Sequence, residues 1–361
     1  MFENLSLLSE QIAERIPAIS IAIGKKGKII YSKAIGQIME CKSRVLPSTR
    51  FDIASITKVF SGIAFMKLVE DGIFALQEPI FKCFPEFNKI KPIEKNGEII
   101  GECDCSKITW YHALTHTTGI GWTRPKTRPS LPKLGTELSD IYDMPMAYMP
   151  GEHIVYSDIP IILMGKAMEM KTKTPLDVLI NNTVIGKLNL KNTGYLKISE
   201  KEQRENIVPT EYDDVFRKRR IHGIVHDENA FLLNGVSAHA GIFSTAEDLC
   251  MTGISFLECL KTNGIIKTVT ANEMIKEHVR ENGDRRGLMW QLSGQTENMA
   301  TRFLSEQAFG HSGFTGCFMW MDPVCDLTIV FLSNDVYNGR DKRCLNEFRE
   351  YIIKSIVEEK S

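Results

Sequence analysis

Phe51-Asp-Ile-Ala-Ser-Ile-Thr-Lys58 (FDIASITK) decides the reading of this chain, because it places a serine and a lysine three positions apart. Apolar residues then recur at three- and four-residue steps, which predicts a helix from about Ser55 to Asp71-Gly72. Ser55 and Lys58 would lie one turn apart on the same helix face. A serine hydroxyl becomes a nucleophile when a neighbouring base takes its proton, and a lysine amine can be that base if its pKa is lowered.

The serine and lysine pair is a weak signal alone, since a capped helix with a surface lysine gives the same pattern. Two triplets further along the chain strengthen the interpretation of this pair as catalytic. Tyr156-Ser157-Asp158 follows a Pro-Gly turn, and His311-Ser312-Gly313 precedes a strand-like run expected at Phe314–Met321. With Ser55 and Lys58, the chain therefore contains three polar motifs in a fixed order: a candidate nucleophile, a triplet with a phenol and a triplet with a histidine.

This order of S-x-x-K, Y-x-[N or D] and H-x-G resembles the serine β-lactamase and penicillin-binding protein superfamily. The resemblance is closest to the class C branch with its related esterases and D,D-peptidases. Phe51–Lys58 looks like the family's lead into the nucleophile, and two more stretches are similar to family segments: Leu114-Thr-His-Thr-Thr-Gly-Ile120 and Gly241-Ile-Phe-Ser-Thr-Ala-Glu-Asp-Leu249. The resemblance extends from about residue 15 to residue 335.

The resemblance implies a role for each matching residue. Ser55 would form an acyl-enzyme, Lys58 would be the base or part of the proton relay, and Tyr156 would pass the proton to the leaving group. The remaining positions implied by the motifs are His311 as a catalytic residue, the backbone N–H groups of Ser55 and Phe314 as the oxyanion hole, and Asp158, Ser312 and Gly313 as substrate contacts. Phe314 is expected on an edge strand. Acyl transfer of this kind needs no metal and no cofactor.

Two residues depart from the family pattern. The β-lactamases of the family usually have lysine where this chain has His311, whereas its esterases and some peptidases have histidine there. A histidine titrates near neutral pH, so activity is expected to change between about pH 6 and 7 if His311 titrates freely. Asp158 stands where many members have asparagine, and an ionised carboxylate accepts hydrogen bonds but cannot donate them. Asp158 could instead pair with Lys58 and keep the lysine charged.

Strand-like runs lie at both ends of the chain, at residues 18–23, 28–34, 314–321 and 327–333, and a closing helix is expected over 342–358. We therefore expect an α/β fold of the α+β type, with one antiparallel sheet built from both ends. The chain is expected to be a single β-lactamase-like domain over 1–361, with its sheet region at about 1–60 plus 235–361 and a helical and loop region at about 61–234. Prolines predict loops and short helices over residues 77–150, and Ser244-Thr-Ala-Glu247 predicts a capping box.

Composition narrows the class of protein. The 361 residues include 44 Lys plus Arg and 45 Asp plus Glu, so the formal net charge of −1 argues against binding nucleic acid through bulk charge. No run approaches the roughly 18 apolar residues of a membrane helix. The N-terminus shows no signal-peptide pattern, and nine scattered cysteines suit a reducing cytoplasm, so a cytoplasmic location is expected unless an export segment was removed.

The sequence thus predicts a serine hydrolase that acts through an acyl-serine intermediate on an ester or amide, as a carboxylesterase or a D,D-carboxypeptidase-like enzyme. Its substrate would be a small ester, peptide or β-lactam; the oligomeric state is open. Three alternatives stand beside it: a true class C-type β-lactamase, a catalytically weak binder of penicillin or peptidoglycan fragments, and a metal or redox protein resting on Cys103 and Cys105.

Several other residues have expected places: His116 and Thr117 in a loop under the site, His239 in packing, His226 or Asn229 reaching the cleft, and Trp122 and Trp290 in the core or at the rim.

Overall fold

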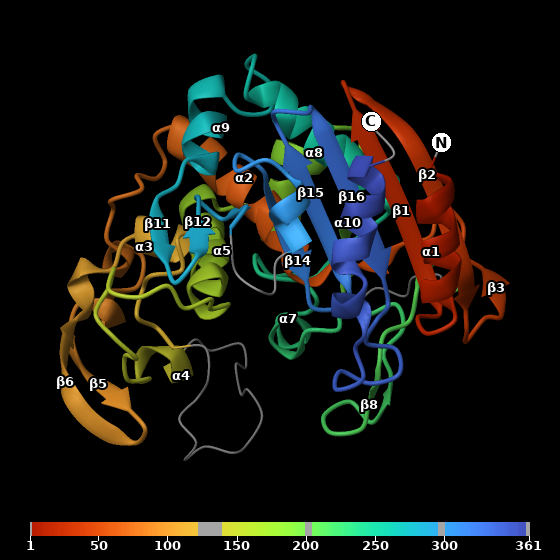
Figure 1. The fold of residues 1–361 in the computed structure, drawn as a ribbon. Helices are drawn as coiled ribbons and strands as arrows, with labels where there is room; N and C mark the ends of the chain where they lie inside the picture. Colours follow the sequence, from red (N-terminus) through yellow and green to blue (C-terminus); the bar gives the residue numbers. More distant parts are fainter. Residues whose placement is uncertain (1, 122–138, 199–203, 295–299, 359–361) are drawn as a thin grey trace.

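A computed structural model describes residues 2–121, 139–198, 204–294 and 300–358. Within these ranges a nine-stranded antiparallel sheet dominates the molecule (Figure 1). Its strands, in spatial order, are β11 (Val279–Glu281), β12 (Asp284–Arg286), β13 (Gln291–Leu292), β14 (Phe309–Gly313), β15 (Cys317–Asp322), β16 (Leu327–Ser333), β1 (Ala18–Lys25), β2 (Lys28–Ile38) and β3 (Ser43–Arg44).

The centre of this sheet joins the two ends of the chain. Strand β1 pairs antiparallel with β16, so that Ile21 lies opposite Phe331, and with β2 on its other edge. The expectation of one antiparallel sheet built from both chain ends, with helices around it, is confirmed.

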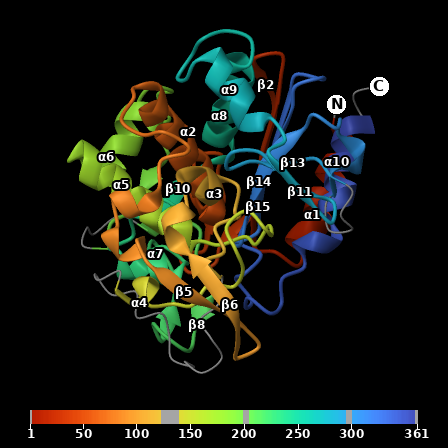
Figure 2. The ribbon, with the colours of Figure 1, turned by 90° about the vertical axis from the view of Figure 1, so that its left-hand side faces the viewer.

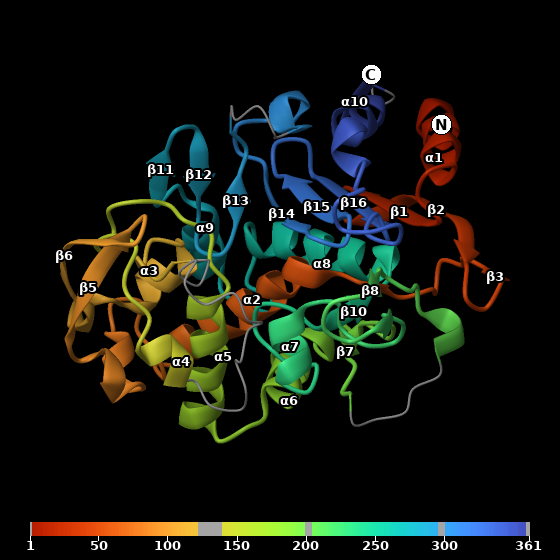
Figure 3. The same ribbon diagram turned by 90° about the horizontal axis from the view of Figure 1, so that it is seen from below.

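Two helical layers cover the sheet, and the alternation along β1 explains how. Ile19, Ile21 and Ile23 pack with α1 (Glu3–Ala13) and α10 (Arg349–Glu358), whereas Ala18 and Ala22 face the core on the other side, where α8 (Ala246–Cys259) lies. Figure 3 shows α1 and α10 on one side of the strands and α8 on the other. Because both faces are covered, β1 and β16 are buried almost along their whole length and are mostly apolar, without a regular alternation of apolar and polar residues.

The region between the sheet strands is mainly helical. Helix α2 (Thr57–Glu70) runs through its centre with nearly every side chain buried, which explains why it is apolar on all sides. Figure 2 shows α5 (Ile159–Thr172) and α6 (Leu176–Ile180) on the side of α2 that faces away from β13 to β15. This packing places the start of α2 between the helical region and the sheet.

The smaller elements complete the fold. A three-stranded sheet has the order β4 (Phe51–Asp52), β10 (Ile242–Ser244) and β7 (Gly194–Tyr195). Other short elements are β8 (Tyr212–Asp213), β9 (Arg219–Arg220), α3 (Trp110–Leu114), α4 (Ser139–Tyr142), α7 (Glu228–Leu232) and α9 (Thr268–Ile275). Across the described ranges, no helix has both the length and the apolarity needed to cross a bilayer.

The predicted first residue of the strand at Phe314–Met321 is wrong. His311, Ser312 and Gly313 end strand β14, residues 314–316 form a turn, and β15 begins at Cys317. Gly316 closes the turn by donating its N–H to the Gly313 carbonyl at 3.2 Å and has a φ of +106°, which favours glycine. Phe314 therefore lies in a tight turn and not on an edge strand.

The loops expected over residues 77–150 contain a β-hairpin that the sequence reading missed. It consists of β5 (Ile90–Lys95) and β6 (Glu98–Asp104), joined through Asn96 and Gly97 with φ of +55° and +88°. An Asn-Gly pair is a strong hairpin signal, and Pro92 is tolerated because this ladder has only two strands.

Several predicted helix ends also shift. Ser55 lies in a short 3-10 turn, Ala54–Ile56, and α2 begins two residues after it, while the closing helix begins at Arg349 and not near Lys342. The cap of α8 is Thr245, whose hydroxyl accepts the Asp248 N–H at 3.2 Å, because Ser244 still belongs to strand β10.

Candidate active site

Ser55 stands at a sharp bend between β4 and α2. The residue before it, Ala54, has a φ of +46°, a left-handed conformation that is strained for any residue with a Cβ. Asp52 supports the bend, since its Oδ1 accepts the Ala54 N–H at 2.8 Å. The bend leaves Ser55 half-buried on the wall of a cavity of about 800 Å³.

Lys58 lies fully buried in the first turn of α2 and contacts three parts of the chain. Its Nζ donates to Ser55 Oγ at 2.9 Å and to the His239 carbonyl at 3.2 Å, and it forms an ion pair with Asp158 Oδ1 at 2.7 Å. Burial lowers the pKa of Lys58, but Asp158 and Tyr156 outweigh it, so the pKa lies above its usual value. Lys58 is therefore an ammonium ion in the resting protein.

Tyr156 lines the cavity and lies next to Lys58. The Lys58 Nζ lies 4.8 Å from the centre of the tyrosine ring, and the His116 ring lies 4.6 Å from it. The phenol oxygen is buried and makes no hydrogen bond of good geometry within the described residues. Burial raises the pKa of Tyr156 and Lys58 opposes this, which leaves a neutral phenol close to the nucleophile.

His311 lies on β14 and is neutral, which corrects the expectation of titration near pH 6 to 7. Its Nδ1 lies 2.8 Å from the Ser312 carbonyl, and because a carbonyl only accepts, the hydrogen is on Nδ1. Burial, with the charge of Lys58, lowers the pKa of His311 to about 3. Its Nε2 is buried without a partner in the described part of the chain, so it presents a free lone pair and no positive charge.

Strand β14 comes close enough to the nucleophile bend only because it ends in glycine. A Cβ at Gly313 would stand 2.4 Å from the Ile53 carbonyl oxygen, so any side chain would push the two segments apart. Ser312 and Gly313 line the cavity with Phe314, whose side chain is 41% exposed. The structure thus brings Ser55, Lys58, Tyr156, His311 and the Phe314 turn to one place.

The cavity is lined by four arginines and three carboxylates, and the sequence did not predict the arginines. Its lining residues share a place around Ser55 and include four arginines: Ala54, Ser55, Tyr156, Asp158, His226, Asp227, Glu228, Ala240, Arg286, Gln291, His311, Ser312, Gly313, Phe314, Arg340, Arg343, Asn346 and Arg349. Arg340 pairs with Glu211 and Glu228, and Arg286 pairs with Asp284. Arg343 and Arg349 make no ion pair with any carboxylate in the described ranges.

Arg349 is the most informative of these side chains. Its Nη1 donates to Ser312 Oγ at 3.3 Å, while its Nε is buried with no partner among the described residues. Burial lowers the pKa of Arg349, yet a guanidinium stays charged at neutral pH. An arginine beside Ser312 supplies the fixed positive charge that His311 cannot supply.

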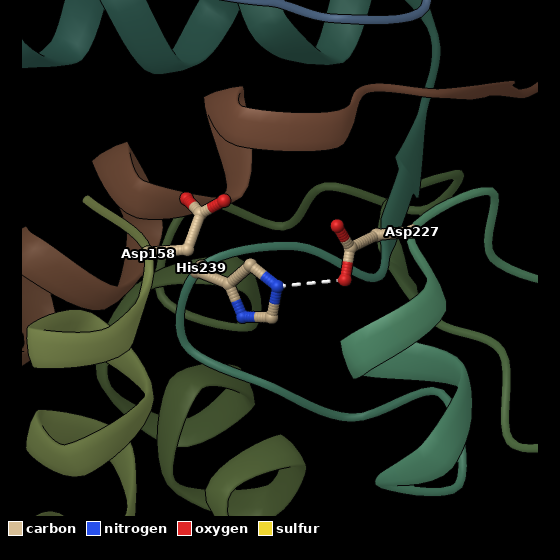
Figure 4. A group of neighbouring side chains, drawn as sticks. All are labelled: Asp158, Asp227 and His239. Carbon is tan, nitrogen blue, oxygen red and sulfur yellow. Dashed lines mark hydrogen bonds and ion pairs between the residues drawn. The ribbon is translucent and has the colours of Figure 1, made fainter. Parts of the chain in front are cut away.

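Asp158, Asp227 and His239 are the described residues whose arrangement could hold a metal ion, since their ligand atoms lie within 4.8 Å of one another. Figure 4 shows the His239 ring between the two carboxylates. Each group already has a partner: His239 Nε2 lies 2.8 Å from Asp227 Oδ1, and Asp158 holds the Lys58 ammonium. A lysine ammonium next to the site repels a cation, so these contacts fit a hydrogen-bonded network better than a metal centre.

The other residues expected near the site separate into two groups. His226 lines the cavity and His116 lies beneath Tyr156, whereas Asn229 lines a neighbouring cavity of about 630 Å³. Trp290 is a core residue packed against Phe256 and Phe309, and Trp122 lies outside the described residues. Cys103 and Cys105 are buried free thiols.

Comparisons with known proteins identify the family of this chain and structures with the same fold. The family model described as Beta-lactamase matches residues 6–351. A protein of Escherichia coli strain K12 provisionally named D-alanyl-D-alanine carboxypeptidase is 29% identical, over 91% of this chain and 80% of its own. An N-acetylmuramyl-L-alanine amidase of Bacillus subtilis strain 168 is 28% identical, over 91% of this chain and 79% of its own. Among solved structures, a class C beta-lactamase superposes with a TM-score of 0.73 at 19% identity, covering 98% of this chain and 95% of that one.

Proposed function

This chain belongs to the beta-lactamase family of serine hydrolases, and we propose that it is a D,D-carboxypeptidase-like member that cleaves carboxylate-bearing peptides through an acyl-Ser55 intermediate. The observation that carries the proposal is the contact of Lys58 Nζ with Ser55 Oγ at 2.9 Å beside a neutral Tyr156. Two arginines of the same cavity, Arg343 and Arg349, have no carboxylate partner among the described residues. Relatives named for carboxypeptidase and amidase activity support a peptide-like substrate.

The proposed reaction starts from a site that holds one proton too many. Lys58 is charged and Tyr156 is neutral, so neither can accept the Ser55 proton at rest. The Lys58 and Tyr156 pair must first lose one proton as a coupled unit. Ser55 Oγ then attacks the substrate carbonyl, its proton passes to this pair, and Tyr156 returns a proton to the departing amine.

The oxyanion of the tetrahedral intermediate needs two hydrogen-bond donors. We assign these to the backbone N–H groups of Ser55 and Phe314, which flank the cavity from the 3-10 turn before α2 and from the β14–β15 turn. Water replaces the amine as the second nucleophile and releases the acyl group. We propose that His311 Nε2, as a free acceptor, orients a donor of the substrate or that water.

The acyl-enzyme is tested by mass spectrometry after incubation with a fluorophosphonate and with a labelled penicillin. The expected result is one adduct on the wild type, located on Ser55, and none on Ser55→Ala. Absence of an adduct with either probe, or equal labelling of the variant, contradicts the proposal.

The preference for a carboxylate rests on Arg349 and is tested separately. A peptide ending in D-Ala-D-Ala is compared with the same peptide amidated at its C-terminus. Because a hydrogen-bonded charge pair contributes about 1.5–3 kcal/mol, amidation should lower kcat/KM about 10- to 100-fold. The difference should largely disappear in Arg349→Gln, and an equal preference in both proteins contradicts the assignment.

Carboxylesterase activity is the second candidate, and the neutral His311 favours it over β-lactamase activity. Turnover of short-chain p-nitrophenyl esters is compared with turnover of nitrocefin and of the D-Ala-D-Ala peptide. A nitrocefin rate equal to the best of the others supports a true β-lactamase instead. Saturable binding of a peptidoglycan fragment without turnover supports a binding protein.

The proposal also covers the domain organisation, the size of the substrates and the compartment. We propose that the chain works as one domain, that its substrates are small molecules and that it works in a reducing compartment. The odd, scattered set of nine cysteines supports the last point.

A further inference from the structure

We propose that Asp52 is the positioning residue of the oxyanion hole, which fixes the Ser55 and Phe314 backbone N–H groups relative to each other. Asp52 does not line the cavity and contacts no reacting atom. The inference rests on the acyl transfer proposed for Ser55, and it concerns how the two donors are kept in register.

The first link runs from Asp52 to the nucleophile. Its Oδ1 accepts the Ala54 N–H at 2.8 Å, and Ala54 has the left-handed φ of +46°. A strained residue keeps its conformation only where the surroundings determine it. Because Ala54 directly precedes Ser55, this hydrogen bond sets the direction of the Ser55 N–H.

The second link runs from Asp52 to the β14–β15 turn. Thr315 Oγ1 donates to the Asp52 backbone carbonyl at 2.7 Å, and Cys317 Sγ lies 3.7 Å from the same oxygen. Thr315 directly follows Phe314, so the peptide that carries the second donor is attached to the same residue as the first. Gly313 also packs closely against the Ile53 carbonyl, which brings strand β14 next to the segment before Ser55.

The third link comes from the loop before α7. The His226 N–H donates to Asp52 Oδ2 at 2.6 Å, and the His226 ring stacks on Phe314 with ring centres 5.6 Å apart. Burial raises the pKa of Asp52 and the His226 N–H opposes this rise. Asp52 is 2% exposed and has no lysine or arginine partner in the described ranges, so its two oxygens serve backbone N–H groups from two different segments.

Asp322 provides a matched control at the far end of β15. It is also 2% exposed, and it accepts the N–H groups of Ser305 at 2.8 Å and Val324 at 3.0 Å. It does not line the cavity around Ser55. Asp52→Asn and Asp322→Asn thus make the same chemical change in two similar buried environments.

The experiment measures ester hydrolysis and the affinity of a phenylboronic acid, which forms a tetrahedral adduct on an active serine. In Asp52→Asn one backbone N–H group faces an amide NH₂, and the Ser55 and Phe314 N–H groups are no longer held in their relative positions. We expect kcat and boronate affinity to fall together, about 10²-fold, with KM changed less than about threefold. Asp322→Asn should keep both values near those of the wild type even where its melting temperature falls.

Thr315 provides a second test that does not depend on the folding of Asp52→Asn. Thr315→Val removes only the hydroxyl that donates to Asp52, and Thr315→Ser keeps it. We expect Thr315→Val to lose about tenfold or more in boronate affinity and Thr315→Ser to restore most of it. Wild-type boronate affinity in Thr315→Val, or in a folded Asp52→Asn, overturns the inference. Failure of the wild type itself to bind boronate or to acylate overturns the proposed function instead.

Discussion

Lys58 and Asp158 meet 2.7 Å apart at the base of the cavity, and their pairing sets the proton affinity of the whole site. Asp158 raises the pKa of Lys58 and also that of Tyr156. A relative with asparagine in this place lacks that charge. The wild type should therefore become more active as the pH rises above neutral, whichever of the two groups is the base.

Asp158→Asn removes the charge that helps retain the proton on Lys58 and Tyr156. The acidic limb of kcat/KM against pH should move to lower pH by about 1 to 3 units, because an opposite charge at this distance shifts a pKa by that much. Asp177→Asn breaks an aspartate pair with Lys197, outside the cavity lining, and should leave the limb in place. An unshifted limb in Asp158→Asn means that neither group is the base.

His311 should make stability depend on pH. Its pKa of about 3 in the folded protein lies below the usual 6.5, so the unfolded chain binds more protons between these values. The contribution of His311 is complete above about pH 6.5 and declines as the pH falls towards 3, by at most about 1.4 kcal/mol per pH unit.

Urea titrations at pH 7, 6, 5 and 4 measure this dependence. The free energy of unfolding of His311→Gln should fall less steeply with acidification than that of the wild type. Parallel slopes in the two proteins contradict a neutral, buried His311.

Ser55, Lys58, Tyr156 and His311 could be named from the sequence because each belongs to a short motif with fixed spacing. Asp227 and Arg349 could not, because loop and helix packing brings them to the cavity from separate parts of the chain. The neutral state of His311 could not be predicted from the sequence either, because it results from the burial of the side chain in the folded protein.

Strand β14 and the nucleophile bend form one structural junction at Gly313. A Cβ there would stand 2.4 Å from the Ile53 carbonyl oxygen. Gly313→Ala should therefore separate the Phe314 turn from Ser55 and lower kcat about 10²-fold, as for the loss of one oxyanion donor. Steady-state kinetics and melting temperature measure the two effects.

Gly101→Ala, on strand β6, is the matched control for Gly313→Ala, because its Cβ would meet only Ile93 Cδ1 of β5, at 3.8 Å. It should leave kcat unchanged. Full activity of Gly313→Ala would show that the junction tolerates more space than its geometry suggests.

The elements themselves were predictable to different degrees. Strand β1, whose first six residues are apolar except Ser20, and the buried α2 have strong patterns over several residues. The β5–β6 hairpin carried an Asn-Gly signal, but Pro92 argued against a strand. The expected strand at Phe314 failed because aromatic and β-branched residues fit both a strand and a tight turn, and Gly316 decided for the turn.

The whole molecule should unfold as one unit around the β1 and β16 pair. Phe331 is fully buried, stacks on Phe318 with ring centres 5.4 Å apart and lies opposite Ile21. Phe331→Ala should lower the free energy of unfolding by about 3–5 kcal/mol through the lost contacts and the cavity it leaves. Circular dichroism and boronate binding, followed in the same urea series, should lose their signals at one midpoint. Two separate midpoints would indicate that the helical region around α2 is stable without the sheet.

The pairing of β1 with β16 also has a consequence during protein synthesis. Strand β1 ends at Lys25 and its neighbour β16 begins at Leu327, so nearly the whole chain must be translated between them. At roughly 5–20 residues per second, the N-terminal hairpin waits roughly 15 to 60 seconds for its partner. During that time an apolar strand edge is open to pairing with other chains. Ribosome-bound chains of this protein are thus expected to depend on chaperones until β16 emerges, and its heterologous expression should benefit from slow growth at low temperature.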